Sequence, residues 1–170
     1  MLFPDSIFSQ YIRPKYTPYR LALPDPSVLP LEEDIIWDSF LGGIKDAAIQ
    51  FVCDYEDPTP SFLGTGRSEW NASVTIFVMF LYLGEGRPPV AREYAKFLER
   101  YLFVRQPVTE LKTAGINEFR PVRFVISQGP PPFRSIGPIS SSVQNPQTDL
   151  WSLWINIACK YMQAFNLAPP

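Results

Sequence analysis

The stretch "SEWNASVTIFVMFLYLGEG", residues 68–86, decides the fold because it contains the longest apolar run in the chain, residues 72–83. Twelve residues are too few to cross a bilayer, which takes about 20. Ser68 suits a helix N-cap and glycines follow Leu83, so the pattern predicts a central helix over 68–83 that is apolar on nearly all sides. The β-branched residues in its middle favour a central strand as the alternative: Val74, Thr75, Ile76 and Val78.

Helical spacing of apolar residues predicts three more helices, over 32–52, 88–105 and 149–166. The first begins with acids, which suit a helix N-terminus, and the second carries its charges on one side. The third has an aromatic stripe with steps of three and four: Trp151, Trp154, Ala158, Tyr161 and Phe165. This stripe predicts a helix that packs on the core of its own chain or of a neighbouring copy.

The remaining segments are rich in proline. Residues 1–30 contain six prolines and predict an extended arm, and residues 128–147 predict a long loop. A short strand or hairpin is expected at 118–127, where Pro121 restricts the first half to a sheet edge. The expected fold is therefore α+β and mainly helical, with an arm at 1–30 and one domain at 31–170.

Charge is distributed unevenly along the 170 residues, whose net charge is −2. Residues 21–57 hold nine acids against one base, Lys45, whereas residues 58–170 hold eleven bases against seven acids. The two regions can neutralise each other within one fold, or they can attract neighbouring copies head to tail.

Enzymatic chemistry has little support in the sequence. There is no histidine, which removes the commonest general base, and Cys53 and Cys159 lie outside any metal-binding spacing. The remaining carboxylate candidates are Asp34 and Asp38, one helical turn apart in the predicted helix, with Glu56 and Asp57 beyond them. Acids are common in the first turn of a helix, so we expect no enzyme, no cofactor and no metal.

Aromatic and basic residues supply the candidates for an interaction surface. Tyrosines alternate with bases in the predicted arm, a composition that suits stacking on nucleic acid, lying on an anionic membrane, or packing on the protein itself. The candidates are Tyr11, Arg13, Lys15, Tyr16, Tyr19, Arg20, Arg87, Arg92, Arg100, Trp151 and Trp154. Arg120 and Arg123 belong to the same predicted basic face as the arginines of 87–105.

These features predict a non-enzymatic structural protein that assembles with copies of itself. Proline-rich arms around a small core are common in viral matrix and coat subunits. By this architectural analogy we expect a subunit of that type. The alternatives are an adaptor or suppressor that binds a cellular partner through the Pro-rich loop or the tryptophan helix, and a carboxylate-dependent enzyme. Without a recognisable secretory leader or transmembrane segment, we expect an intracellular location, in the cytoplasm or, for a viral protein, in the virion or host cell.

Overall fold

A computed structural model describes residues 3–37, 47–63, 67–104, 108–128 and 149–164. Helices and strands contribute comparably, so the prediction of a mainly helical fold is wrong. The helical elements are α1 (Pro4–Leu21), α2 (Pro89–Leu102), α3 (Thr109–Ala114) and two short 3-10 helices, η1 (Pro26–Val28) and η2 (Glu32–Asp34). The strands are β1 (Ile35–Trp37), β2 (Ala47–Leu63), β3 (Arg67–Leu81), β4 (Ile116–Gln128) and β5 (Leu150–Ala164).

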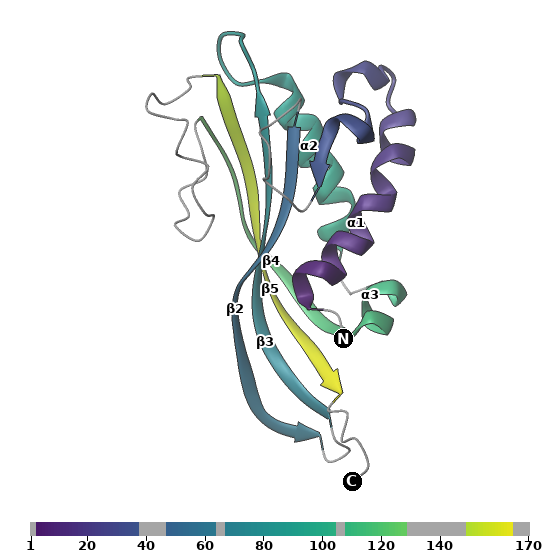
Figure 1. The fold of residues 1–170 in the computed structure, drawn as a ribbon, viewed down its shortest axis with the longest axis vertical. Helices are drawn as coiled ribbons and strands as arrows, with labels where there is room; N and C mark the ends of the chain where they lie inside the picture. Colours follow the sequence, from purple (N-terminus) through teal and green to yellow (C-terminus); the bar gives the residue numbers. More distant parts are fainter. Residues whose placement is uncertain (1–2, 38–46, 64–66, 105–107, 129–148, 165–170) are drawn as a thin grey trace.

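The described strands form one mixed sheet in the order β1-β2-β3-β5-β4. β1 is parallel to β2, and every other pair is antiparallel. β5 lies between β3 and β4 although it comes last in the chain (Figure 1). In the described sheet, β3 and β4 do not pair with each other, and β5 pairs with both of them.

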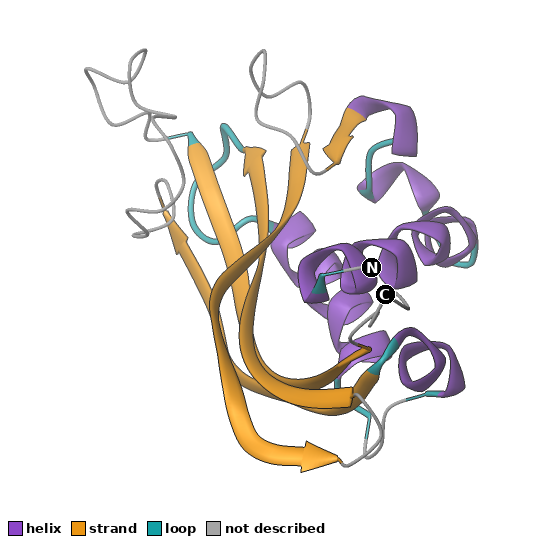
Figure 2. Cartoon of the chain, turned by 60° about the horizontal axis from the view of Figure 1, so that its bottom comes forward, coloured by secondary structure: helices purple, strands orange, loops and turns teal. Residues whose placement is uncertain are grey.

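All three α-helices cover the same face of the sheet, and the strands bend around them (Figure 2). We call this the inner face. Side chains alternate along each strand, so every second residue of β3 and β5 points at the helices. The inner-face residues of these two strands are Ala72, Val74, Ile76, Val78, Phe80, Leu153, Ile155, Ile157, Cys159 and Tyr161, and all are buried in the main core.

Residues 4–21 form a helix rather than the predicted extended arm. Buried residues Ile7, Phe8, Tyr11, Ile12, Tyr16 and Tyr19 recur at helical spacing and make the inner surface of α1. Pro4 begins the helix, where its missing N–H costs nothing. Pro14 and Pro18 lie one turn apart on the exposed side. Water can therefore bind the carbonyl groups that these prolines leave without an N–H donor.

The predicted helices at 68–83 and 149–166 are wrong, because the structure has the central strands β3 and β5 in these segments. β3 and β5 pair along their whole lengths, from Arg67 with Ala164 to Leu81 with Leu150. Central strands are buried on both faces and read as continuous apolar runs, which periodicity alone does not separate from a buried helix. The β-branched alternative for 74–78 was therefore the correct one.

The predicted helix at 32–52 is also wrong. Its described parts are η2, β1 and the beginning of β2, and residues 38–46 lie outside the described structure. Ile35 and Trp37 point to the inner face, where Trp37 meets the ring of Tyr16 at 5.7 Å between centroids. Ile36 points to the other face and packs against a small second cluster.

Two predictions about elements are confirmed. α2 occupies 89–102 within the predicted 88–105, and β4 covers the predicted strand at 118–127 as an edge strand that contains Pro121. α3 ends at Gly115, whose φ of +112° favours glycine. Gly115 also accepts a backbone hydrogen bond from Met162 at 2.9 Å, which fixes the start of β4 against β5.

Candidate functional site

The tyrosines of the N-terminal segment belong to the core. Tyr11, Tyr16 and Tyr19 are at most 8% exposed, and Tyr16 and Tyr19 both contact the ring of Phe97 on α2. Burial raises the pKa of all three phenols, and for Tyr11 the nearby Glu110 carboxylate adds to this effect. The Tyr16 hydroxyl donates to the Pro30 carbonyl at 2.7 Å. These rings join α1 to its own domain and offer no surface for stacking on nucleic acid.

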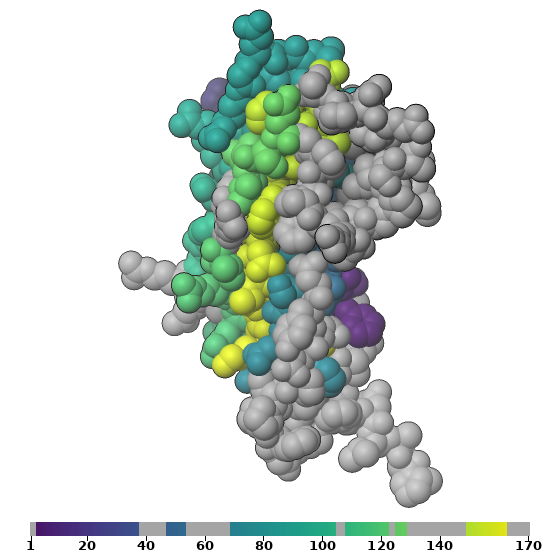
Figure 3. Space-filling model, turned by 90° about the vertical axis from the view of Figure 1, so that its left-hand side faces the viewer, coloured from purple at the N-terminus to yellow at the C-terminus, as the bar shows by residue number. Residues whose placement is uncertain are grey.

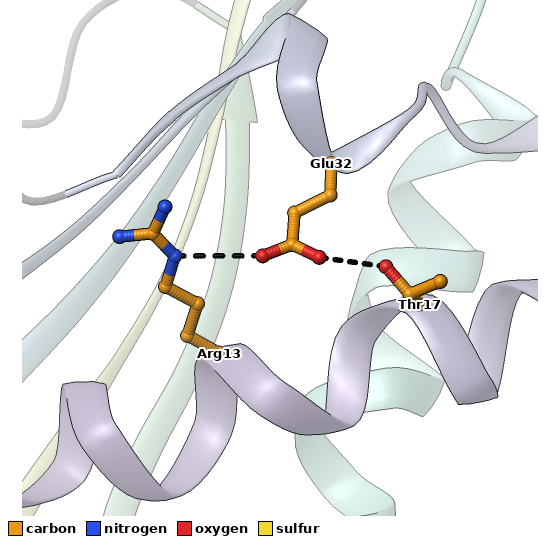
Figure 4. A network of polar contacts seen from close by, with 3 residues as sticks. All are labelled: Arg13, Thr17 and Glu32. Carbon is orange, nitrogen blue, oxygen red and sulfur yellow. Dashed lines mark hydrogen bonds and ion pairs between the residues drawn. The ribbon is translucent and has the colours of Figure 1, made fainter.

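The three bases of α1 also have partners within the chain. Arg13 Nε lies 3.5 Å from a Glu32 carboxylate oxygen, and the other oxygen of Glu32 accepts from Thr17 Oγ1 at 2.7 Å (Figure 4). Lys15 pairs with Glu110 at 3.0 Å and lies over the Tyr11 ring. Arg20 donates to the Leu29 carbonyl at 2.8 Å. Glu32 thus connects η2 to α1. This ion pair agrees with the expectation that acidic and basic residues neutralise each other within one fold.

Trp151 and Trp154 lie on opposite faces of β5 and form no stripe. Trp151 is half-buried and packs against the main core on the inner face. Trp154 is buried on the opposite face, where it is in register with Phe77 of β3 and Val125 of β4. Both residues complete the sheet of their own chain.

The arginines of α2 and of the turn before it are exposed. Arg87 and Arg92 line a groove of about 740 Å³ that also contains Glu93, Lys96 and Glu99. Lys96 pairs with Glu93 at 3.0 Å, and Arg100 lies 5.9 Å from the Tyr101 ring. Acids alternate with bases along this groove, so it is not a uniformly basic surface.

The carboxylate candidates for catalysis are not assembled into a site that the structure describes. Asp34 is half-buried in η2, and Asp38 lies outside the described residues, as do the side chains of Glu56 and Asp57. Within the described part of the chain, no group of histidine, cysteine, aspartate or glutamate side chains could hold a metal ion.

Figure 3 shows the face of the sheet opposite the helices, which we call the outer face, with β4 in green beside β5 in yellow. The described residues of this face are apolar at one end and polar in the middle. Ala48, Met79 and Leu150 form a small buried cluster at the apolar end. In the middle, Asn156 donates hydrogen bonds to Ser73 at 2.9 Å and to Thr75 at 3.0 Å. This polar ladder fixes the register of β3 against β5 on the outer face.

A depression of about 410 Å³ lies beside the polar ladder and crosses β3, β5 and β4. Its lining residues are Asn71, Ala72, Ser73, Glu118, Phe119, Arg120, Ala158, Cys159 and Lys160. Phe119 contacts Phe8 of α1 on the inner face, so the neighbouring Glu118 and Arg120 point to the outer face. The register places Ala158 between Ser73 and Arg120, and Lys160 between Asn71 and Glu118.

Two cations define the chemistry of this depression. Lys160 lies 3.7 Å from Glu118, and both side chains are largely solvated, so this ion pair is weak. Arg120 is exposed, and the described residues provide it with no ion pair. Asn71 and Ser73 add neutral hydrogen-bonding groups, and the small Ala158 leaves room between the longer side chains. The arrangement suits a carboxylate that carries an apolar neighbour.

Sequence reasoning named Arg120 as part of a basic face but missed Lys160, Glu118, Asn71 and Ser73. These residues are up to 89 positions apart and meet only through the pairing of β3, β5 and β4. Alternating polar residues in "NAS" and "EFR" were a signal for half-exposed strands. The sequence did not show that these residues meet, because this depends on the order of the strands in the sheet.

None of the helices described in the structure is long and apolar enough to cross a membrane. No protein-family model matches the chain, and neither does any curated protein.

Proposed function

We propose that the chain is a non-enzymatic structural subunit that assembles with copies of itself. The observation that carries the proposal is the presence of exposed acids beside α1 and of two bases on the opposite face of the sheet. The segment that contains η1 and η2 lies beside α1 and exposes Asp25 and Glu33, whereas Arg120 and Lys160 lie across the sheet on the outer face. Such an arrangement favours contact between unlike surfaces of successive copies.

The structure changes the reasons for this proposal. The comparison with viral matrix and coat subunits depended on an extended arm, and α1 takes its place, so that comparison loses its support. The alternative of an adaptor that binds through a tryptophan helix also loses support, because residues 150–164 form a strand of the sheet and not a helix. The Pro-rich segment at 128–147 lies almost wholly outside the described residues.

Sedimentation velocity over a range of protein and salt concentrations tests the proposal. We expect species larger than one 19.4 kDa chain at low ionic strength, and a shift toward the monomer as salt screens the charges. A strict monomer at high protein concentration and low salt would show that the proposal is wrong.

A further inference from the structure

We propose that the depression on the outer face receives the acidic segment 31–34 of a neighbouring copy, an inference that rests on the self-assembly proposed above. This segment projects Leu31 at 45% exposure and Glu33 into solvent. Glu32, between them, is held by Arg13 and Thr17. The segment therefore presents one apolar and one acidic side chain from an anchored backbone.

The depression offers a complementary set of groups. Arg120 is available for a carboxylate because the described residues give it no ion pair, and Lys160 can exchange its weak contact with Glu118 for a better one. Ala158, which is exposed on the outer face, provides apolar surface for a side chain such as Leu31. The volume of about 410 Å³ lies within the range of small binding pockets.

The positions of the two surfaces decide what kind of assembly they make. The acidic segment contacts α1 on the inner side of the sheet, whereas the depression is on the outer face. A copy therefore does not fill its own depression by a local movement of the segment. Each copy uses a different surface toward each of two neighbours, which gives a ring or a filament rather than a two-fold dimer.

The sheet edges are poor alternatives for assembly. β4 contains Pro121 and two breaks in register with β5. β2 pairs with β1 only at residues 47–49, and beyond them it contains Pro58 and two breaks in register with β3. Prolines and bulges on edge strands are devices that prevent strands of separate molecules from pairing. Contact through a face of the molecule is therefore favoured over extension of the sheet.

Charge reversal on each surface tests the proposal in the full chain. We expect Arg120→Glu alone, and Glu33→Arg alone, to weaken assembly at least tenfold in sedimentation velocity at low salt. A mixture of the two variants should assemble again with the variants in alternation, because each contact between unlike variants is either native or reversed on both sides. Arg92→Glu and Glu99→Arg are the matched controls, since these exposed α2 residues lie outside the proposed contact.

Circular dichroism establishes that each variant is folded, and Arg120→Gln serves if Arg120→Glu is not. If the parent chain assembles but these variants assemble equally well, the docking proposal is wrong and self-assembly by another surface stands. If Arg120→Glu acts but Glu33→Arg does not, the depression takes a different partner and the proposal is again wrong. Glutarate that binds at Arg120 without competing with assembly would assign the depression to a small anion instead. A parent chain that is always monomeric overturns both proposals.

Discussion

At the scale of single residues, buried aromatic rings decide how the helices are held together. Phe97 of α2 contacts Tyr16 and Tyr19 of α1 as well as Tyr101 of its own helix, with ring centroids 5.2 to 5.5 Å apart. Rings at these separations add to the energy of burial through their edge-to-face contacts. The tyrosines that looked suited to a ligand in the sequence are therefore the contacts that fix α1.

The hydroxyl of Tyr16 provides a test of this burial. Because burial raises its pKa in the folded state above about 10, the unfolded chain releases the proton first as pH rises, and the free energy of unfolding falls above about pH 10. Tyr16→Phe should cost about 1 kcal/mol at pH 7 through loss of the bond to Pro30, and should make the alkaline decline shallower. Urea unfolding at pH 7 and pH 11 measures both effects.

Tyr11 and Tyr19 also have raised pKa values, so the variant should retain part of the decline. An alkaline profile parallel to that of the parent chain would mean that Tyr16 titrates normally in the folded protein. Tyr16→Phe should leave the circular dichroism spectrum unchanged, because the ring that packs on Phe97 is kept.

At the scale of elements, the sequence predicted those whose two sides differ in polarity. α2 alternates buried and charged residues at helical spacing, and β4 is a half-exposed strand with a proline at the edge. The strands β3 and β5 were predicted as helices because large apolar residues lie on both of their faces. Phe77, Met79 and Trp154 are buried on the outer face. Helix α1 was predicted as part of an extended arm because Pro14 and Pro18 argued against a helix, although the apolar residues have helical spacing.

The two interior prolines of α1 give a prediction at this scale. Pro14→Ala and Pro18→Ala should each stabilise the domain by about 1–3 kcal/mol, because alanine restores an N–H donor and has the highest helix propensity. Alanine leaves the unfolded chain more flexible than proline does, and this gain in unfolded-state entropy offsets part of the stabilisation. Urea midpoints of the two variants provide the measurement. Destabilisation by either variant would mean that the proline has a role beyond helix propensity.

At the scale of the whole molecule, the N-terminal segment and the sheet form one packed unit. The main core takes residues from α1, α2, α3 and all five strands. The depression could not be predicted from sequence, because its groups come from three strands whose order does not follow the chain. The charge division along the sequence was visible, but only the fold shows that Asp25 and Glu33 are exposed beside α1 and that Arg120 and Lys160 lie on the outer face.

Removal of residues 1–20 tests whether α1 is part of the packed core. An extended arm would be dispensable for folding, and its loss would abolish only assembly. With Phe8, Ile12 and Tyr16 fully buried, we expect the shortened chain to lose its cooperative thermal transition. Circular dichroism against temperature checks this. A shortened chain that melts cooperatively near the temperature of the parent would contradict the packing of α1.

The interior place of β5 also has a consequence for synthesis. β3 and β4 are synthesised before residues 150–164 and have no direct pairing with each other. Until β5 is made, the edge of the apolar strand β3 that pairs with it is open. Contacts between segments this far apart in sequence slow folding and leave such edges open to aggregation. This protein must therefore complete its sheet late, and chaperones that bind exposed apolar strands would have their longest opportunity just before β5 appears.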